Sequence, residues 1–206
     1  MKKLFGMACV AAAAATICSA CCCGANSCEA TDSAAVVLET IMTRTSVRAY
    51  TDQPVAAETV EQLLRAGMAA PTAVNKQPWA FVVLQDREQL DRLREVHPNA
   101  RMLATAQVAI VVCGDMTKAL EGTGRDFWIQ DASAATENIL LAAHALGLGA
   151  VWTGVYPNPE RTAAISEVLG LPEEIIPLCV IPIGYPAENP EPKDKWKPEN
   201  VHYGVW

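Results

Sequence analysis

A helical pattern between Asp126 and Leu146 has apolar residues on more than one of its faces. A helix of this kind has to be buried on several sides, and its small residues let neighbouring elements come close. The pattern therefore predicts a long helix that is buried on several sides. The apolar positions are Trp128, Ile129, Ala132, Ala135, Ile139, Leu140 and Ala143.

Strand signals alternate with this and four other helical patterns along the chain. Residues 108–113 form an apolar, β-branched run that is typical of an interior strand. The run 175–183 contains Pro177 and Pro182, which cannot donate to a sheet ladder, so we expect it at an edge or a bulge. The other two strands are predicted at residues 79–84 and 150–155.

The remaining helices are predicted from apolar residues at helical spacing. Asp32 and Ser33 offer N-caps to the first of them, which carries one apolar stripe. Gly170 closes the last one, and Pro71 ends the second, so residues 72–77 are expected to form a loop. The stripe consists of Val36, Val37, Leu38, Ile41 and Met42. The four helices are expected near 33–42, between Pro54 and Pro71, at 87–96 and at 159–169.

Composition limits both the size of the fold and the possible partners. A chain of 206 residues with 51% apolar and 19% charged content fits one globular domain of ordinary core size. Its formal net charge is −7, and no run of Lys or Arg occurs outside the N-terminus. Because contacts with phosphates of a nucleic acid need clustered cations, the sequence argues against a nucleic-acid surface.

The beginning of the chain predicts a secretory leader. Lys2 and Lys3 precede an Ala-rich apolar stretch, 4–17, which is too short to span a bilayer comfortably. The string from Cys18 to Cys21 resembles the lipobox of bacterial lipoproteins, which implies that Cys21 is acylated after cleavage. We expect residues 1–20 to be a lipoprotein-type signal peptide, 21–32 a linker and 33–206 the folded domain. Such a protein would be exported and anchored in the bacterial envelope, or cytoplasmic if the leader is not used.

The cysteines allow two further interpretations. Six of the eight lie in the first 28 residues, and thiolates bind zinc, but no second pair or His follows at a usable spacing. We therefore favour export over a metal site. Cys113 and Cys179 lie in apolar runs and are predicted to be buried thiols, with a disulfide between them left open.

Polar residues gather in two loops. Residues 44–48 contain two Arg and two hydroxyls, which can surround a phosphate, although Arg is also favoured at a solvated helix end by the helix dipole. Residues 70–79 place a hydroxyl, two amides and a Lys between two prolines. This second loop suits a planar heteroaromatic ligand with hydrogen-bonding edges, or is an ordinary connection from helix to strand.

Four motifs in order resemble the FMN-dependent nitroreductase family. They are Arg44-Thr45-Ser46-Val47-Arg48-Ala49-Tyr50, the stretch 70–81, the helix and strand 131–152, and residues 183–188. The resemblance covers about residues 38–206. It implies an α+β fold of three layers, α/β/α, in which helices flank a mixed, largely antiparallel sheet. It also implies an intertwined homodimer with FMN at the subunit interface, in which the C-terminal extension embraces the second subunit.

The resemblance also assigns roles to individual residues. Arg44, Ser46 and Arg48 would bind the FMN phosphate and ribityl chain, with Thr45 contributing mainly its backbone. The other residues would contact the flavin ring or the phosphate. Pro71, Thr72, Ala73 and Asn75 would line the flavin from the neighbouring subunit; Trp152, Thr153 and Gly154 would face its reactive edge; Arg101 would reach its pyrimidine edge; Lys193 and Lys195 would meet the phosphate. Both of these lysines stand where Arg is frequent, which keeps the charge and loses bidentate geometry.

The chemistry implied by the resemblance is hydride transfer through flavin N5. NAD(P)H would be the donor, a nitroaromatic, quinone or similar small molecule the acceptor, and the mechanism ping-pong, without a catalytic triad or a metal. The residues that set the acceptor are expected within 115–128, and His97, His144 and His202 are expected to be structural. Two other classes stay open: a membrane-anchored lipoprotein that binds flavin or another planar ligand without turnover, and a dimeric scaffold without a cofactor.

Overall fold

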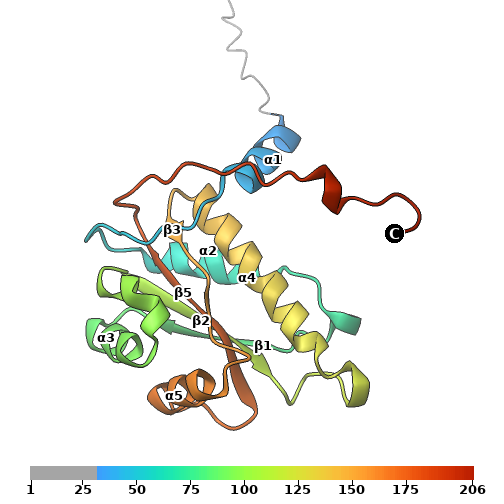
Figure 1. Ribbon diagram of the computed structural model, residues 1–206. Coiled ribbons are helices and arrows are strands. Elements are labelled where there is room, and N and C mark those ends of the chain that lie inside the picture. Colours follow the sequence, from blue (N-terminus) through green and yellow to red (C-terminus); the bar gives the residue numbers. More distant parts are fainter. Residues whose placement is uncertain (1–31) are drawn as a thin grey trace, which may run out of the picture. The chain divides into compact units, whose positions relative to one another are not determined.

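The computed structural model describes residues 32–206 (Figure 1). The predicted signal peptide, the acylation site Cys21 and the cysteine cluster lie outside the described residues. From residue 32 onward, no helix is both long enough and apolar enough to cross a lipid bilayer.

Five strands form one sheet in the order β1-β2-β5-β3, with β4 also paired to β5. Each pairing among the described strands is antiparallel. All eight residues of β2 are buried, as expected for an interior strand covered on both faces. The strands are β1 Trp79–Leu84, β2 Val108–Asp115, β3 Gly149–Ala150, β4 Thr153–Gly154 and β5 Ile175–Gly184.

The position of β5 corrects one prediction and confirms its alternative. The edge position is wrong, because β5 lies between β2 and the two short strands. The bulge is present: Val112 pairs with Cys179 but Cys113 pairs with Pro177, so the register shifts by one residue at Leu178. A proline lacks the ladder N–H and is tolerated beside such a bulge, even in the middle of a sheet.

The predicted strand 150–155 is interrupted. The structure has two short strands, β3 and β4, separated by Val151 and Trp152. The Ala150 carbonyl, at the end of β3, accepts a hydrogen bond of 3.1 Å from the Val47 N–H. The segment around Val47 therefore pairs with the backbone just before the strand is interrupted.

Helices cover both faces of the sheet, which confirms the predicted three-layer α+β fold (Figure 1). The long helix α4 buries eight residues, and Gly67 of α2 lies so close to Ile139 that an added Cβ would be 3.0 Å from its side chain. One face carries α2 Ala57–Met68 and α4 Phe127–Ala145; the other carries α3 Arg87–Val96, the 3-10 helix η2 Pro98–Ala104 and α5 Pro159–Leu169.

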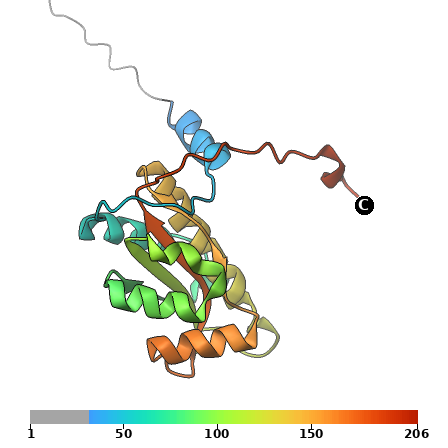
Figure 2. The same ribbon diagram turned by 60° about the vertical axis from the view of Figure 1, so that its left-hand side comes forward.

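Helix α1, Ser33–Thr43, differs from the others because none of its residues is buried. Its cap is as predicted, since the Asp32 carboxylate accepts from the Ala34 N–H at 3.0 Å. The predicted stripe is present but faces solvent within this single chain, and the exposed fractions of Leu38 and Met42 are 61% and 69%. Both views show that the chain after β5 passes beside α1 and then extends away from the sheet toward the C-terminus (Figures 1 and 2).

Cys113 and Cys179 are buried thiols, as predicted, and the open alternative of a disulfide is wrong. Cys179 belongs to the core under α4, with its Sγ 3.4 Å from Thr136 Oγ1, whereas Cys113 belongs to the core on the opposite face of the sheet. Burial raises the pKa of both thiols to about 12.

Candidate functional site

The segment 44–51 crosses the end of the sheet and is bonded to it along its length. Besides the Val47–Ala150 bond, the Thr51 N–H donates to the Tyr185 carbonyl at 2.8 Å. These backbone bonds fix the two-arginine segment, residues 44–48, against β3 and the end of β5. The polar side chains of this segment then face away from the sheet and can contact a ligand.

Two glycines allow this close approach. A Cβ added at Gly149 would lie 2.6 Å from the Val47 side chain, and one added at Gly184 would lie 2.9 Å from that of Tyr50. The Tyr50 hydroxyl donates toward the Val47 and Pro182 carbonyls, at 2.7 and 3.0 Å. Burial, and then the nearby Glu188 carboxylate, raise the pKa of this phenol, which therefore remains neutral.

A cavity of about 280 Å³ lies between this segment and the chain that follows β5. It combines the two arginines and both hydroxyls of the motif with both predicted lysines of the C-terminal segment. The lining residues are Arg44, Thr45, Ser46, Arg48, Pro190, Glu191, Lys193 and Lys195. The structure thus brings together residues that are about 150 positions apart in the sequence.

Positive charge exceeds negative charge in this cavity. Arg44 is paired with Glu137 of α4 at 3.3 Å, and Glu188 accepts from the Arg48 backbone N–H at 2.5 Å. No ion pair within residues 32–206 involves Lys193 or Lys195. Charge-assisted hydrogen bonds from such a cluster suit a phosphate or another compact anion.

The loop after α2 is fixed by a buried carboxylate that the sequence analysis missed. Asp131 of α4 accepts from the Ala73 N–H at 2.8 Å, and the Thr72 hydroxyl accepts from the Gln77 N–H at 3.1 Å. The available signal for Asp131 was a carboxylate directly beside apolar positions of a helix that was expected to be buried on several sides. The predicted ligand residues Pro71, Thr72, Ala73 and Asn75 do not line the cavity of their own chain.

This loop has an unusual backbone. Val74, Asn75 and Gln77 have φ values of 52°, 54° and 51°, in the left-handed region that L residues with side chains rarely adopt. Val74 is β-branched and its exposed fraction is 81%, so its conformation is set by the hydrogen bonds around it and not by burial.

Strand β4 presents a different set of groups. The Thr153 hydroxyl donates to the Val180 carbonyl at 2.7 Å and lies 3.0 Å from His97 Nε2, so the side chain of this predicted ligand residue points into the protein. Gly154 is exposed, its carbonyl accepts from Arg161 Nη1 at 2.8 Å, and an added Cβ would meet no atom within 4 Å. A ligand could therefore approach the backbone at Gly154.

The other residues that were predicted to contact the flavin or to set the acceptor lie in different surroundings. Arg101 is exposed on η2, which packs against β4, and it does not line the cavity. Trp152 is half-buried against the α4 core. In the region expected to set the acceptor, Trp128 is a core residue that meets Tyr156 edge-to-face at 5.0 Å, whereas Phe127 is exposed.

Sequence and structure comparisons identify the family. The sequence profile described as the nitroreductase family matches residues 41–98 and 95–185, and this chain belongs to that family. It is 48% identical over 171 residues to the "Putative NADH dehydrogenase/NAD(P)H nitroreductase" of Methanothermobacter thermautotrophicus, covering 82% of this chain and 87% of the relative.

Solved structures agree with the sequence relatives. An FMN-dependent nitroreductase from Clostridium difficile is 30% identical with a TM-score of 0.75, over 82% of this chain and 99% of that one. An NADPH:FMN oxidoreductase from Vibrio harveyi, solved with NAD+, is 28% identical with a TM-score of 0.75, over 83% of this chain and 78% of that one.

Proposed function

We propose that this chain binds FMN and uses NAD(P)H to reduce a nitroaromatic, a quinone or a similar small acceptor. The observation that carries the proposal is the cationic cavity of Arg44, Arg48, Lys193 and Lys195, which lies in a member of the nitroreductase family. Relatives of this chain are named for FMN or flavin and for NADH, NADPH or NAD(P)H.

The residues present fit the phosphate end of FMN. Two guanidinium groups and two ammonium groups outweigh the one carboxylate, Glu191, that lines the same cavity. The hydroxyls of Thr45 and Ser46 add donors at its wall. In this assignment Arg44 exchanges part of its interaction with Glu137 for the phosphate, and the two lysines supply charge without the bidentate geometry of arginine.

Other residues are assigned to the ring end. The exposed backbone at Gly154 would approach the flavin edge, with half-buried Trp152 beside it and the backbone of Thr153 connecting the two. Arg101, on the neighbouring η2, would extend toward the pyrimidine edge. Pro71, Thr72, Ala73 and Asn75 would contact the ring bound by the partner subunit, since they do not line the cavity of their own chain.

When bound, FMN supplies the group that accepts hydride from NAD(P)H and passes it to the acceptor. The protein residues bind the phosphate and orient the ring, and the backbone at Gly154 offers dipoles to the reacting edge. Because the redox chemistry belongs to the cofactor, this chain needs no acid–base triad. The nicotinamide would stack on the exposed face of the ring.

The proposed assembly is a homodimer. The apolar face of α1 and the aromatic residues Trp196, Tyr203 and Trp206 are exposed in the single chain. Exposed apolar surface of this extent favours association, and a twofold interface would bury both features and complete the flavin site. The C-terminal extension would then embrace the second subunit.

We also propose that the protein is exported and acylated at Cys21. The support is the leader composition and its lipobox-like string. Metabolic labelling with palmitate, comparing the natural chain with Cys21→Ser, tests this. Label that disappears in the variant is the expected result; an unlabelled natural chain whose leader remains intact would favour a cytoplasmic location.

The phosphate assignment is tested with FMN and riboflavin, which differ by the phosphate alone. We expect Arg44→Ala combined with Arg48→Ala to weaken FMN binding by at least about 100-fold, since each charge-assisted bond contributes about 1.5–3 kcal/mol. The dissociation constant of riboflavin should change by less than about threefold in the same variant. Arg65→Ala, an exposed arginine of α2 paired with Glu61, is the matched control. Equal losses for both ligands would contradict the assignment.

A further inference from the structure

Strand β4 is only two residues long, yet two side chains from other elements hold it. His97, at the junction of α3 and η2, contacts the Thr153 hydroxyl at 3.0 Å. Arg161 of α5 donates to the Gly154 carbonyl at 2.8 Å. Both contacts come from within the protein and leave the exposed side of Gly154 open.

The hydrogen bonds determine the tautomer of His97. Thr153 has one hydroxyl proton, and it is donated to the Val180 carbonyl at 2.7 Å. The Thr153 oxygen must therefore accept from His97, which places the imidazole proton on Nε2. Nδ1 is buried and has no hydrogen-bond partner, so it carries a lone pair in the neutral ring.

The surroundings also keep His97 neutral. Burial, and then the positive charge of Arg161, lower its pKa to about 4. From residue 32 to the C-terminus, no carboxylate forms an ion pair with the ring. A protonated ring would place a buried N–H at Nδ1 without an acceptor, so the neutral Nε2–H form is the one that fits this site.

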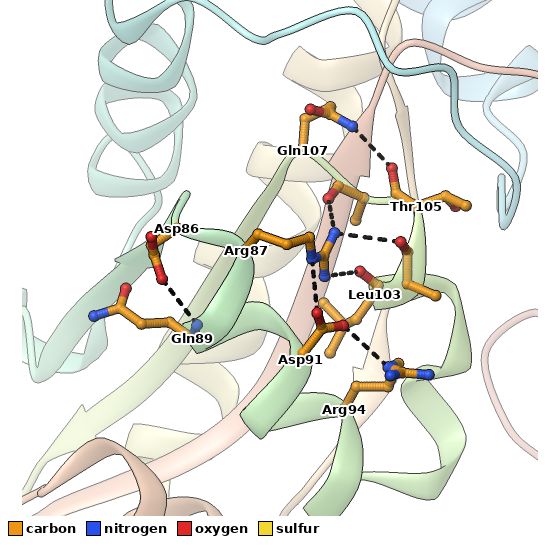
Figure 3. A network of polar contacts seen from close by, with 10 residues as sticks. Asp86, Arg87, Gln89, Asp91, Arg94, Leu103, Thr105 and Gln107 are labelled. Carbon is orange, nitrogen blue, oxygen red and sulfur yellow. Dashed lines mark hydrogen bonds and ion pairs between the residues drawn. The ribbon is translucent and has the colours of Figure 1, made fainter.

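A second network fixes the segment that carries His97 (Figure 3). Arg87 of α3 donates to the carbonyls of Leu103, Ala104 and Ala106 at the end of η2, at 2.5, 3.3 and 3.2 Å. Asp91 pairs with Arg87 at 3.2 Å. These contacts join the start of α3 to the end of η2, the two elements that meet at His97.

We propose that His97 is a positioning residue whose Nε2–H, through the Thr153 hydroxyl, fixes the Trp152–Gly154 backbone where the flavin ring binds. The inference rests on the proposed function, because it assigns this backbone to the ring. His97 itself touches no cofactor; it acts through Thr153, with Arg161 holding the next carbonyl.

Position-specific variants test the proposal at pH 7.5. His97→Leu removes the donor, and we expect FMN and riboflavin to bind about tenfold more weakly, by the same factor, because the loss is at the ring. His97→Gln keeps an N–H donor at a similar reach and should restore binding to within about threefold of the natural chain. Thr153→Val should resemble His97→Leu, and the double variant should lose little more, because both remove the same bond.

Three measurements accompany each variant: flavin affinity by fluorescence, the absorption spectrum of the bound flavin, and urea unfolding. Thr162→Val is the matched control, since the Thr162 hydroxyl of α5 is buried without a partner and lies beside Arg161. It should leave both affinities and the bound spectrum unchanged. A shifted flavin spectrum in His97→Leu, with recovery in His97→Gln, is the expected signature that a purely structural role would not produce.

The outcomes separate the two claims. If the natural chain binds neither flavin, the proposed function fails and this inference with it. If the natural chain binds both, but folded His97→Leu and Thr153→Val bind as well as it does, this inference alone is overturned. It is also overturned if His97→Gln is as weak as His97→Leu. Should His97→Leu fail to fold, Thr153→Val and His97→Gln decide; if none of the three folds, His97 is structural and the inference is wrong.

Discussion

His97 links the stability of the fold to pH. Its pKa of about 4 in the folded chain lies below the ordinary value of 6.5, so the unfolded chain binds more protons between these values. The stabilising contribution of the neutral ring is therefore complete above pH 6.5 and is lost as pH falls toward 4.

We predict that the His97-dependent loss between pH 7.5 and 4.5 is about 2–3 kcal/mol of unfolding free energy. Urea unfolding of the natural chain and of His97→Gln at both pH values measures it, because acidic residues titrate in both chains and cancel in the difference. A pH dependence that is unchanged in His97→Gln would show that this ring is not responsible.

At the scale of the elements, the spacing of apolar residues was sufficient to predict the positions of helices, but it did not predict which strands are neighbours in the sheet. Residues at helical spacing predict α2, α3 and α5 because that pattern is local. The edge position expected for β5 was wrong. A proline in the sequence shows only that one ladder N–H is missing, and this does not determine which strands lie on either side. The bulge at Leu178 accommodates Pro177 in the sheet centre.

The same limit applies to the site. The motif from Arg44 to Arg48 was visible because its polar residues are adjacent, and resemblance supplied Lys193 and Lys195. Asp131 and His97 were missed as partners because each bonds to a residue more than 50 positions away. Such pairs are set by the packing of α4 and η2 and have no local signature.

Two glycines of neighbouring strands should respond differently to substitution. Gly149→Ala places a methyl group 2.6 Å from Val47, so we expect about 1–3 kcal/mol of destabilisation and a shift of the two-arginine segment that weakens FMN binding. Gly154→Ala meets nothing within 4 Å in the chain and should leave stability within about 0.5 kcal/mol while weakening flavin binding.

Urea unfolding and flavin titration of both alanine variants measure these effects. Each variant serves as the control of the other, because the substitution is the same and neither glycine has a positive φ. Undiminished flavin binding by Gly154→Ala would argue against a close approach of the ring at β4.

The whole molecule, as a single chain, leaves apolar surface exposed along α1. We predict a homodimer in solution, and we expect Leu38→Glu with Ile41→Glu to raise its dissociation constant by at least about 100-fold, because buried charges without partners are costly. Sedimentation equilibrium measures this, with Glu39→Gln on the same helix as control. A natural chain that is monomeric at micromolar concentration would contradict the predicted interface.

The most direct test of the flavoenzyme claim is the visible absorption spectrum of purified residues 30–206, recorded anaerobically before and after addition of NADPH or NADH. The account predicts a flavin spectrum that is bleached by the nicotinamide and returns when a quinone or nitroaromatic acceptor is added. A chain that stays colourless after incubation with FMN, or a bound flavin that neither nicotinamide bleaches, would contradict it.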